Sequence, residues 1–265
     1  MPRFSYIVMP ALTTFRTPDD FHRILVLLKE CGYDGVEINL TEPMGIDPGV
    51  LTRWLADLGL VIPSFLTGEA YNDGLCLSSP DESIRRRTVE RLIGYLDMAR
   101  EFQAILVVGL LQGLRSDEPD PDAAQPRIVA CLGQVAAAAE EKGVEFVLEP
   151  VNHLQVGFNN SVGEVRKLVE TVGSSALKPM VDTVHLNIEE RSLVQPILDC
   201  GTELRHVHIC ESNGSTFGTG HIDFANVLKT LDDIGYDGFA SVKVYRGATL
   251  EEGARSSIEY LRRLR

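Results

Sequence analysis

The stretch of sequence that decides the fold is residues 127–149, which read RIVACLGQVAAAAEEKGVEFVLE. The run from Arg127 to Lys142 has the apolar spacing of an amphipathic helix, and Gly143 stands where such a helix ends. A short apolar run from Val144 to Glu149 follows at once, as expected of a buried strand. The stretch therefore predicts a helix followed directly by a strand.

The same unit recurs along the whole chain. Further apolar, β-branched runs predict strands at 4–9, 35–39, 61–66, 104–109, 178–182, 206–210 and 239–244. Helical patterns lie between them, for example at 19–30, 81–102, 162–172 and 223–234. Capping residues precede these patterns at Ser79–Glu82, Ser161 and Asp223, and glycines follow them at Gly32, Gly173 and Gly235. Strands that alternate with helices predict βαβ units and parallel pairing.

Eight such units can form either a closed barrel or a doubly wound open sheet. No GxGxxG follows the first strand and no P-loop is present, which disfavours the nucleotide-binding open sheets. The length of 265 residues suits one α/β barrel, which typically takes about 250 residues. Since no linker or low-complexity run divides the chain, we predict a single (β/α)₈ TIM barrel domain over residues 1–265.

Composition narrows the partners and the compartment. A net charge of −13 disfavours a nucleic-acid partner, because phosphate binding depends on clustered Lys and Arg. The N-terminus has no signal-peptide pattern and no segment approaches the roughly 20 apolar residues of a membrane span, so we expect a cytoplasmic protein without a membrane partner. The odd number of cysteines, five, without a CxxC pair predicts buried, reduced thiols.

Polar residues end the later predicted strands, where the active site of a barrel enzyme lies. The fifth strand ends in Glu149, the sixth in Asp182, and the seventh carries His206 and His208, which share one side of that strand. Carboxylate and imidazole ligands from neighbouring strands suit Mn²⁺, Mg²⁺, Co²⁺ or Zn²⁺. We therefore predict that Glu149, Asp182 and His208 bind a metal or a substrate.

Several motifs resemble those of the xylose isomerase-like barrels, and in particular of the D-tagatose and D-psicose 3-epimerase branch. The motifs are GYDGVEI (32–38), DGLCLSSPDESIRRR (73–87), LEPVNH (148–153), VDTVHLNIEE (181–190), HVHICESNG (206–214) and GTGHIDFANVLKTLDDIGYDGF (218–239). The resemblance spans essentially the whole chain.

The resemblance implies a set of site residues. In the 3-epimerase branch a Glu, an Asp, a His and a second Glu hold one divalent metal, and the first three fall on Glu149, Asp182 and His208. A substrate-contacting histidine falls on His185. The two glutamates of that branch act as base and acid on opposite faces of the substrate carbon. The expected cofactor is thus one divalent ion, with Mn²⁺ the first candidate.

This chain departs from the branch at three positions. The second ligand glutamate is Lys243, a substrate-contacting glutamate is Gln155, and an arginine is Gly214. We keep Gln155 as a predicted substrate-binding residue, together with Glu211 after the seventh strand. The glycine-rich stretch 214–220 is either an anion-binding loop or an ordinary flexible one.

Lys243 allows three interpretations. It could be the second proton-transfer group beside a three-ligand metal, with a pKa lowered by the cation and by partial burial. Its ammonium could instead take the place of the metal between Glu149 and Asp182, so that no ion is bound. In the third interpretation the site has lost its chemistry.

We expect a metal-assisted isomerase or epimerase that acts on a small ketose, keto-polyol or related hydroxy-carbonyl compound. Glu149 is the predicted base and Lys243 the second acid or base, while His185 orients the substrate. A lyase or dehydratase of the same superfamily and a catalytically silent sugar-binding barrel are the alternatives. An AP endonuclease is disfavoured because the chain is acidic and has only six histidines. The expected partners are a sugar-like substrate and further copies of the chain, as a dimer or tetramer.

Overall fold

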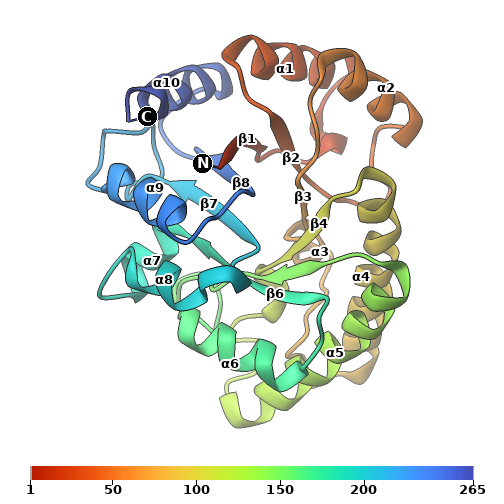
Figure 1. The fold of residues 1–265 in the computed structure, drawn as a ribbon. Helices are drawn as coiled ribbons and strands as arrows, with labels where there is room; N and C mark the ends of the chain where they lie inside the picture. The colour runs from red at the N-terminus through yellow and green to blue at the C-terminus, as the bar shows by residue number, and fades with distance from the viewer. Residues whose placement is uncertain (1, 265) are drawn as a thin grey trace.

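Apolar runs of the sequence form eight parallel strands that close into one barrel in this computed structural model, which describes residues 2–264 (Figure 1). The strands are β1 (Arg3–Val8), β2 (Gly35–Asn39), β3 (Ser64–Leu66), β4 (Ile105–Val108), β5 (Phe146–Leu148), β6 (Leu177–Asp182), β7 (His206–Cys210) and β8 (Phe239–Lys243). Each strand pairs with its neighbours in chain order, and β1 pairs with β8 to close the barrel. The predicted (β/α)₈ barrel is confirmed.

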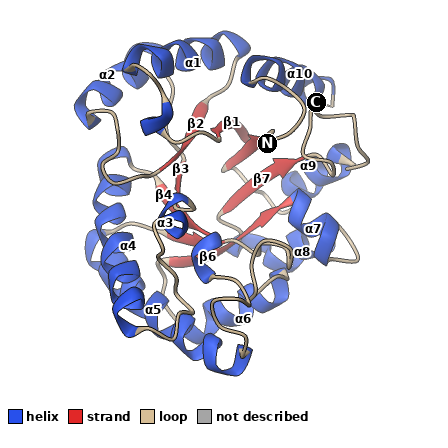
Figure 2. Cartoon of the chain, turned by 180° about the vertical axis from the view of Figure 1, so that it is seen from behind, coloured by secondary structure: helices blue, strands red, loops and turns tan. Residues whose placement is uncertain are grey.

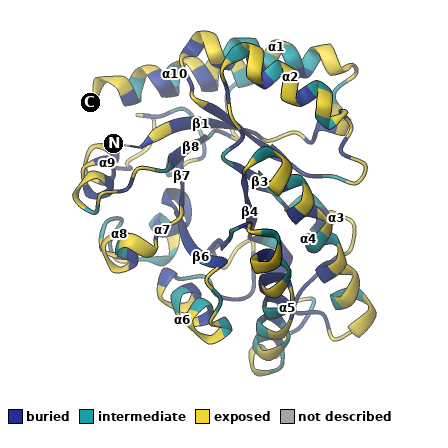
Figure 3. Ribbon diagram, turned by 45° about the vertical axis from the view of Figure 1, so that its right-hand side comes forward, coloured by how far each residue is buried: buried dark blue, intermediate teal, exposed yellow. Residues whose placement is uncertain are grey.

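Helices surround the strands on all sides (Figure 2). They are α1 (Pro18–Cys31), α2 (Pro48–Leu58), α3 (Glu69–Asn72), α4 (Glu82–Phe102), α5 (Pro121–Lys142), α6 (Val162–Val172), α7 (Thr183–Glu189), α8 (Gln195–Cys200), α9 (Phe224–Asp233) and α10 (Leu250–Arg263). Short 3₁₀ helices are η1 (Leu12–Thr14), η2 (Leu110–Gln112) and η3 (Gly201–Glu203). The outer faces of the helices are exposed, while the strands are almost entirely buried (Figure 3).

Helix caps set most boundaries as the sequence predicts. Ser161 forms a capping box with Glu164 at the start of α6, and Gly173 ends that helix in the left-handed conformation, at φ +69°. The predicted start of α5 at Arg127 is wrong, because α5 begins at Pro121 and contains Pro126. Asp120 caps this earlier start by accepting a hydrogen bond from the Asp122 N–H, and Pro121 suits the first turn.

Residues alternate along each strand between the helices and the barrel interior. Leu106, Phe146, Val181 and Val207 pack outward in the main core between strands and helices. Facing inward, Ile105, Val107, Val147 and Met180 form a separate apolar cluster together with the half-buried Leu66. We call these five residues the apolar half of the barrel interior; β3–β6 supply them.

Two expectations about the rest of the chain can be compared with the structure. All five cysteines are buried and none is in a disulfide, as predicted. Among residues 2–264, no helix combines the length and the apolar character that crossing a membrane requires.

Candidate active site

The ends of β5–β8 bring four of the predicted site residues to one end of the barrel. Glu149 directly follows β5, and its N–H extends the ladder by donating to the Val108 carbonyl over 2.8 Å. Asp182 and Lys243 are the last residues of β6 and β8. His208 lies in the middle of β7. Neighbouring parallel strands thus place two carboxylates, one imidazole and one ammonium beside each other.

Glu149, Asp182 and His208 offer ligand atoms that all lie within 4.8 Å of one another, and all three residues are buried. The His208 Nδ1 lies 3.3 Å from the Glu149 Oε1 and 3.7 Å from the Asp182 Oδ2. Both Glu149 Oε1 and His208 Nδ1 are buried without a hydrogen-bond partner among residues 2–264. Because a buried polar atom without a partner is costly, two such atoms facing one point indicate that a ligand belongs there.

This donor set fits a divalent cation. Two carboxylates and an imidazole are oxygen and nitrogen ligands of the kind that Mn²⁺, Co²⁺ and Zn²⁺ accept. Three protein ligands also leave coordination positions for a substrate, as a catalytic metal requires. Glu149, Asp182 and His208 are therefore the residues that would hold the metal.

Lys243 stands beside this set and pairs with one of its members. Its ammonium donates a hydrogen bond to the Asp182 Oδ2, and its side chain is 12% exposed. Burial alone would lower the pKa of Lys243, but Asp182 and Glu149 raise it above its ordinary value. Two buried carboxylates thus stabilise the charged amine, and the lowered pKa expected beside a bound cation stays a prediction.

The two carboxylates respond in the opposite direction. Burial would raise the pKa of Asp182, but the positive charge of Lys243 holds it well below its usual range. The pKa of Glu149 is also lowered against the effect of burial, by His208 and Lys243. Both groups are therefore carboxylates at neutral pH, available to bind a cation or accept a proton.

His185 points a ring N–H into the same space. Asn152 accepts a hydrogen bond from the Leu154 N–H with its Oδ1 (3.1 Å), so its amide Nδ2 is the atom that faces the His185 Nδ1 at 2.7 Å. His185 accepts this bond at Nδ1, which leaves the proton on Nε2. That Nε2 lies 3.6 Å from the Glu149 Oε1 and 3.8 Å from the Asp182 Oδ2. Burial lowers the pKa of His185, in keeping with a neutral ring that donates from Nε2.

The backbone around Glu149 is held by residues that the sequence did not single out. Gln112 donates to the Glu149 carbonyl from its Nε2 over 3.1 Å and accepts from the Asn159 amide over 2.9 Å. A Cβ atom at Gly109, after β4, would lie 2.6 Å from the Glu149 Oε2. Glycine is thus needed at position 109 to leave room for the Glu149 carboxylate.

The two remaining predicted site residues form no hydrogen bond or ion pair with the other five among residues 2–264. Gln155 is exposed in the loop after β5. Glu211 is buried, and its carboxylate accepts hydrogen bonds from the N–H groups of Ser212 (2.8 Å), Gly218 (3.0 Å) and Ile222 (3.1 Å). Of these three N–H groups only that of Gly218 belongs to the glycine-rich stretch 214–220, and it points toward the Glu211 carboxylate. The substrate contacts predicted for Gln155 and Glu211 stay predictions.

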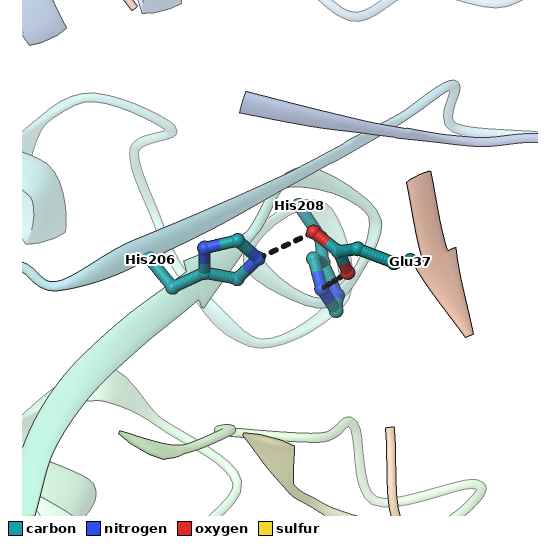
Figure 4. A group of neighbouring side chains, drawn as sticks. All are labelled: Glu37, His206 and His208. Atoms are coloured by element: carbon teal, nitrogen blue, oxygen red, sulfur yellow. Dashed lines mark hydrogen bonds and ion pairs between the residues drawn. The ribbon is translucent and has the colours of Figure 1, made fainter. Parts of the chain in front are cut away.

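A second polar group lies deeper in the barrel, and the sequence reasoning did not foresee it. Glu37 of β2 accepts hydrogen bonds from the Nε2 atoms of His206 (2.8 Å) and His208 (3.1 Å) (Figure 4). Ser241 of β8 also donates to Glu37. We call Glu37, His206, His208 and Ser241 the interior cluster. Burial would lower the pKa of His208, but Glu37 and the site carboxylates raise it well above its usual value.

Comparison with known proteins agrees with the fold. The sequence profile of the xylose isomerase-like TIM barrel family matches residues 25–264. The chain belongs to this family. An L-ribulose 3-epimerase of Mesorhizobium japonicum is 30% identical over 236 residues, which cover 88% of this chain and 78% of that protein. A ketose 3-epimerase of Arthrobacter globiformis is 32% identical over 212 residues, covering 79% and 72% of the two chains.

Solved structures of family members give the same result. The structure of an L-ribulose 3-epimerase superposes with a TM-score of 0.87 at 25% identity and covers all of this chain and 94% of that one. These relatives of the xylose isomerase-like family are sugar epimerases, the class of enzyme that the motifs led us to expect. The resemblance stated from the motifs is confirmed.

Proposed function

We propose that the protein is a metal-assisted ketose 3-epimerase, which inverts the configuration of the carbon next to the carbonyl of a small ketose. The observation that carries this proposal is that Glu149, Asp182 and His208 meet, and that Glu149 Oε1 and His208 Nδ1 are buried without a hydrogen-bond partner among residues 2–264. The similarity to L-ribulose and ketose 3-epimerases supports the choice of reaction. A divalent ion held there, with Mn²⁺ the first candidate, would polarise the carbonyl and stabilise negative charge on the substrate oxygens.

Glu149 and Lys243 supply the two proton transfers. The Glu149 carboxylate takes the proton from the carbon next to the carbonyl, and the electron pair left on that carbon moves onto the carbonyl oxygen. The Lys243 ammonium then gives a proton to the same carbon as the electron pair returns. Because β5 and β8 are separated by β6 and β7 in the barrel, we expect the two groups to approach the substrate from different sides, as inversion requires.

A charged lysine suits the second step because it is an acid. Its ammonium carries a proton on Nζ, which the negative charge on the substrate can accept. His185 would donate from Nε2 to a substrate oxygen and hold the sugar in register with both groups. Gln155 and Glu211 are further candidates for substrate contacts.

Deuterium exchange tests this reaction. Purified protein with Mn²⁺ in heavy water should incorporate deuterium at C3 of a ketose such as L-ribulose or D-psicose and yield its 3-epimer, both seen by NMR. Glu149→Gln removes the base and should slow exchange by about 10²–10⁴-fold. Absence of exchange with every ketose, although Mn²⁺ is bound, would contradict the proposal.

One observation favours a second candidate, a sugar-binding barrel without a metal. The contact between Lys243 and Asp182 already balances one negative charge of the site. Metal analysis and Mn²⁺ titration of the wild type and of Lys243→Glu separate the two candidates. A wild type that binds no ion beside a variant that binds tightly would favour the metal-free barrel. Loss of water or bond cleavage in the exchange reaction would instead indicate a lyase.

Further properties belong to the same proposal. We propose that the enzyme works in the cytoplasm. It consists of a single domain and forms at least a dimer. Its substrate is a ketose, either with or without a phosphate group. Size-exclusion chromatography with light scattering tests the oligomer. The exchange assay with paired free and phosphorylated ketoses tests the substrate.

A further inference from the structure

The interior cluster connects the far side of the barrel to a predicted metal ligand. Glu37 belongs to β2, whereas His206 and His208 belong to β7, and β1 and β8 lie between these strands in the barrel. All three residues are buried, and the Glu37 side chain is 0% exposed. Figure 4 shows the carboxylate with one oxygen bonded to each of the two imidazole rings. The contact therefore depends on closure of the barrel.

A carboxylate of this kind determines where its histidines carry their protons. Ionised Glu37 can only accept hydrogen bonds, so each Nε2 that faces it carries hydrogen. Its Oε1 accepts from His206 at 2.8 Å and its Oε2 from His208 at 3.1 Å. The other nitrogen of the His208 ring, Nδ1, is then the atom that faces Glu149 and Asp182. A bound cation needs the lone pair of this Nδ1.

Glu37 is itself fixed from its other side. Its Oε1 accepts from Ser241, whose Oγ lies 2.6 Å from the Ser5 Oγ. His206 holds the same oxygen, and its ring lies edge-on to that of His208 with centroids 5.1 Å apart. One oxygen of the carboxylate is thus anchored by groups that are not predicted metal ligands. The second oxygen is left to orient one that is.

We propose that Glu37 is a positioning residue, which holds the His208 ring with Nε2–H toward β2 and Nδ1 toward the metal. The proposal rests on the proposed function for the identity of the ion, but not for the orientation of the ring. Carboxylate partners of metal-bound histidines set the tautomer and raise ligand basicity, and their loss typically costs about 10–100-fold in affinity. We expect Glu37 to contribute by the same amount.

The first experiment measures metal affinity in the full chain. Mn²⁺ titration followed by electron paramagnetic resonance should give a Kd about 10–100-fold weaker for Glu37→Gln than for the wild type. Ile105→Ala is the control, because it changes an inward-facing residue of the apolar half and leaves the interior cluster and the predicted ligands untouched. Its Kd should stay close to that of the wild type. A Glu37→Gln variant with the wild-type Kd, or an equal loss in both variants, would overturn the proposal.

The second experiment needs no metal, and its result is read from the wild-type protein. Long-range ¹H–¹⁵N NMR of wild-type protein labelled at histidine reports which ring nitrogens carry hydrogen, and His206→Gln helps to assign the signals. A protonated His208 Nε2 supports the proposal whether Nδ1 is protonated or not. An unprotonated His208 Nε2 overturns it. If the wild type binds no ion, the proposed metal chemistry fails, while this measurement still decides the role of Glu37.

Discussion

The two halves of the barrel interior differ in chemistry although the same alternation of residues builds both. On β3–β6 most inward side chains are those of the apolar half, such as Ile105, Val147 and Met180, beside the polar Ser64 and Asp182. On β7, β8, β1 and β2 they include His206, His208, Ser241, Ser5 and Glu37, which bond to one another. The side chains of the apolar half contribute packing alone. The polar side chains of the other half also orient one another through hydrogen bonds. Part of the barrel core therefore orients His208, one of the predicted metal ligands.

The largest change in unfolding free energy is expected from Lys243→Met, which removes the ammonium group from the polar side of the site. Breaking a buried ion pair costs about 3–5 kcal/mol because the partner charge is left uncompensated. Asp182 is that partner. Urea unfolding in the presence of a chelator should show this loss, and Mn²⁺ should restore more stability to the variant than it adds to the wild type. Equal stabilisation of both proteins by Mn²⁺ would show that Lys243 and the ion do not compete.

Met180→Ala tests the apolar half with a change of similar size. Met180 lies two residues before Asp182 on β6, faces the same side and is fully buried. Removing its side chain leaves a cavity, and we expect a loss of about 2–5 kcal/mol in unfolding free energy. The Kd for Mn²⁺ should change little. A large loss of metal affinity without loss of stability would mean that the two halves do not divide their tasks as described.

Lowering the pH is expected to reduce the unfolding free energy by a smaller amount. The pKa of Asp182 is lowered by folding, so the stabilisation that it contributes is present above the unfolded pKa of about 3.9 and is lost as the pH falls below it. Unfolding free energies measured by urea between pH 7 and pH 4 should therefore begin to fall at the acid end for the wild type. Met180→Ala should give a parallel curve, lower at every pH.

Asp182→Asn is the matched variant on the same strand, and its curve should be flatter at the acid end. Each tenfold change in proton affinity corresponds to about 1.4 kcal/mol. If Asp182→Asn and Met180→Ala gave curves of the same shape, Asp182 would not be the group responsible.

Much of the fold follows from the sequence because short apolar runs and capping residues act locally. The strands at 35–39 and 206–210 and the helix at 162–172 match the structure residue for residue. The strand predicted at 144–149 shortens to Phe146–Leu148, and that at 61–66 to Ser64–Leu66. Apolar runs continue past the paired residues, so the pattern alone does not mark where pairing stops.

The predicted site was recovered in part for a similar reason. Glu149, Asp182 and His208 end or occupy neighbouring strands, so the topology alone brings them together. Glu37 and Asn152 were not foreseen, although both lie within motifs that carry the family resemblance. Which inward residues meet across a barrel depends on the register of all eight strands, and one strand's pattern does not contain that register.

The carboxylate of Glu211 has a consequence for redesign of substrate specificity. This carboxylate accepts hydrogen bonds from N–H groups one, seven and eleven residues farther along the chain. The bonds therefore depend on the length of the loop that follows β7. A Cβ atom at Gly220 would lie 2.4 Å from the Glu211 Oε1. Loop grafts that insert or delete residues between 211 and 222 would therefore break these hydrogen bonds.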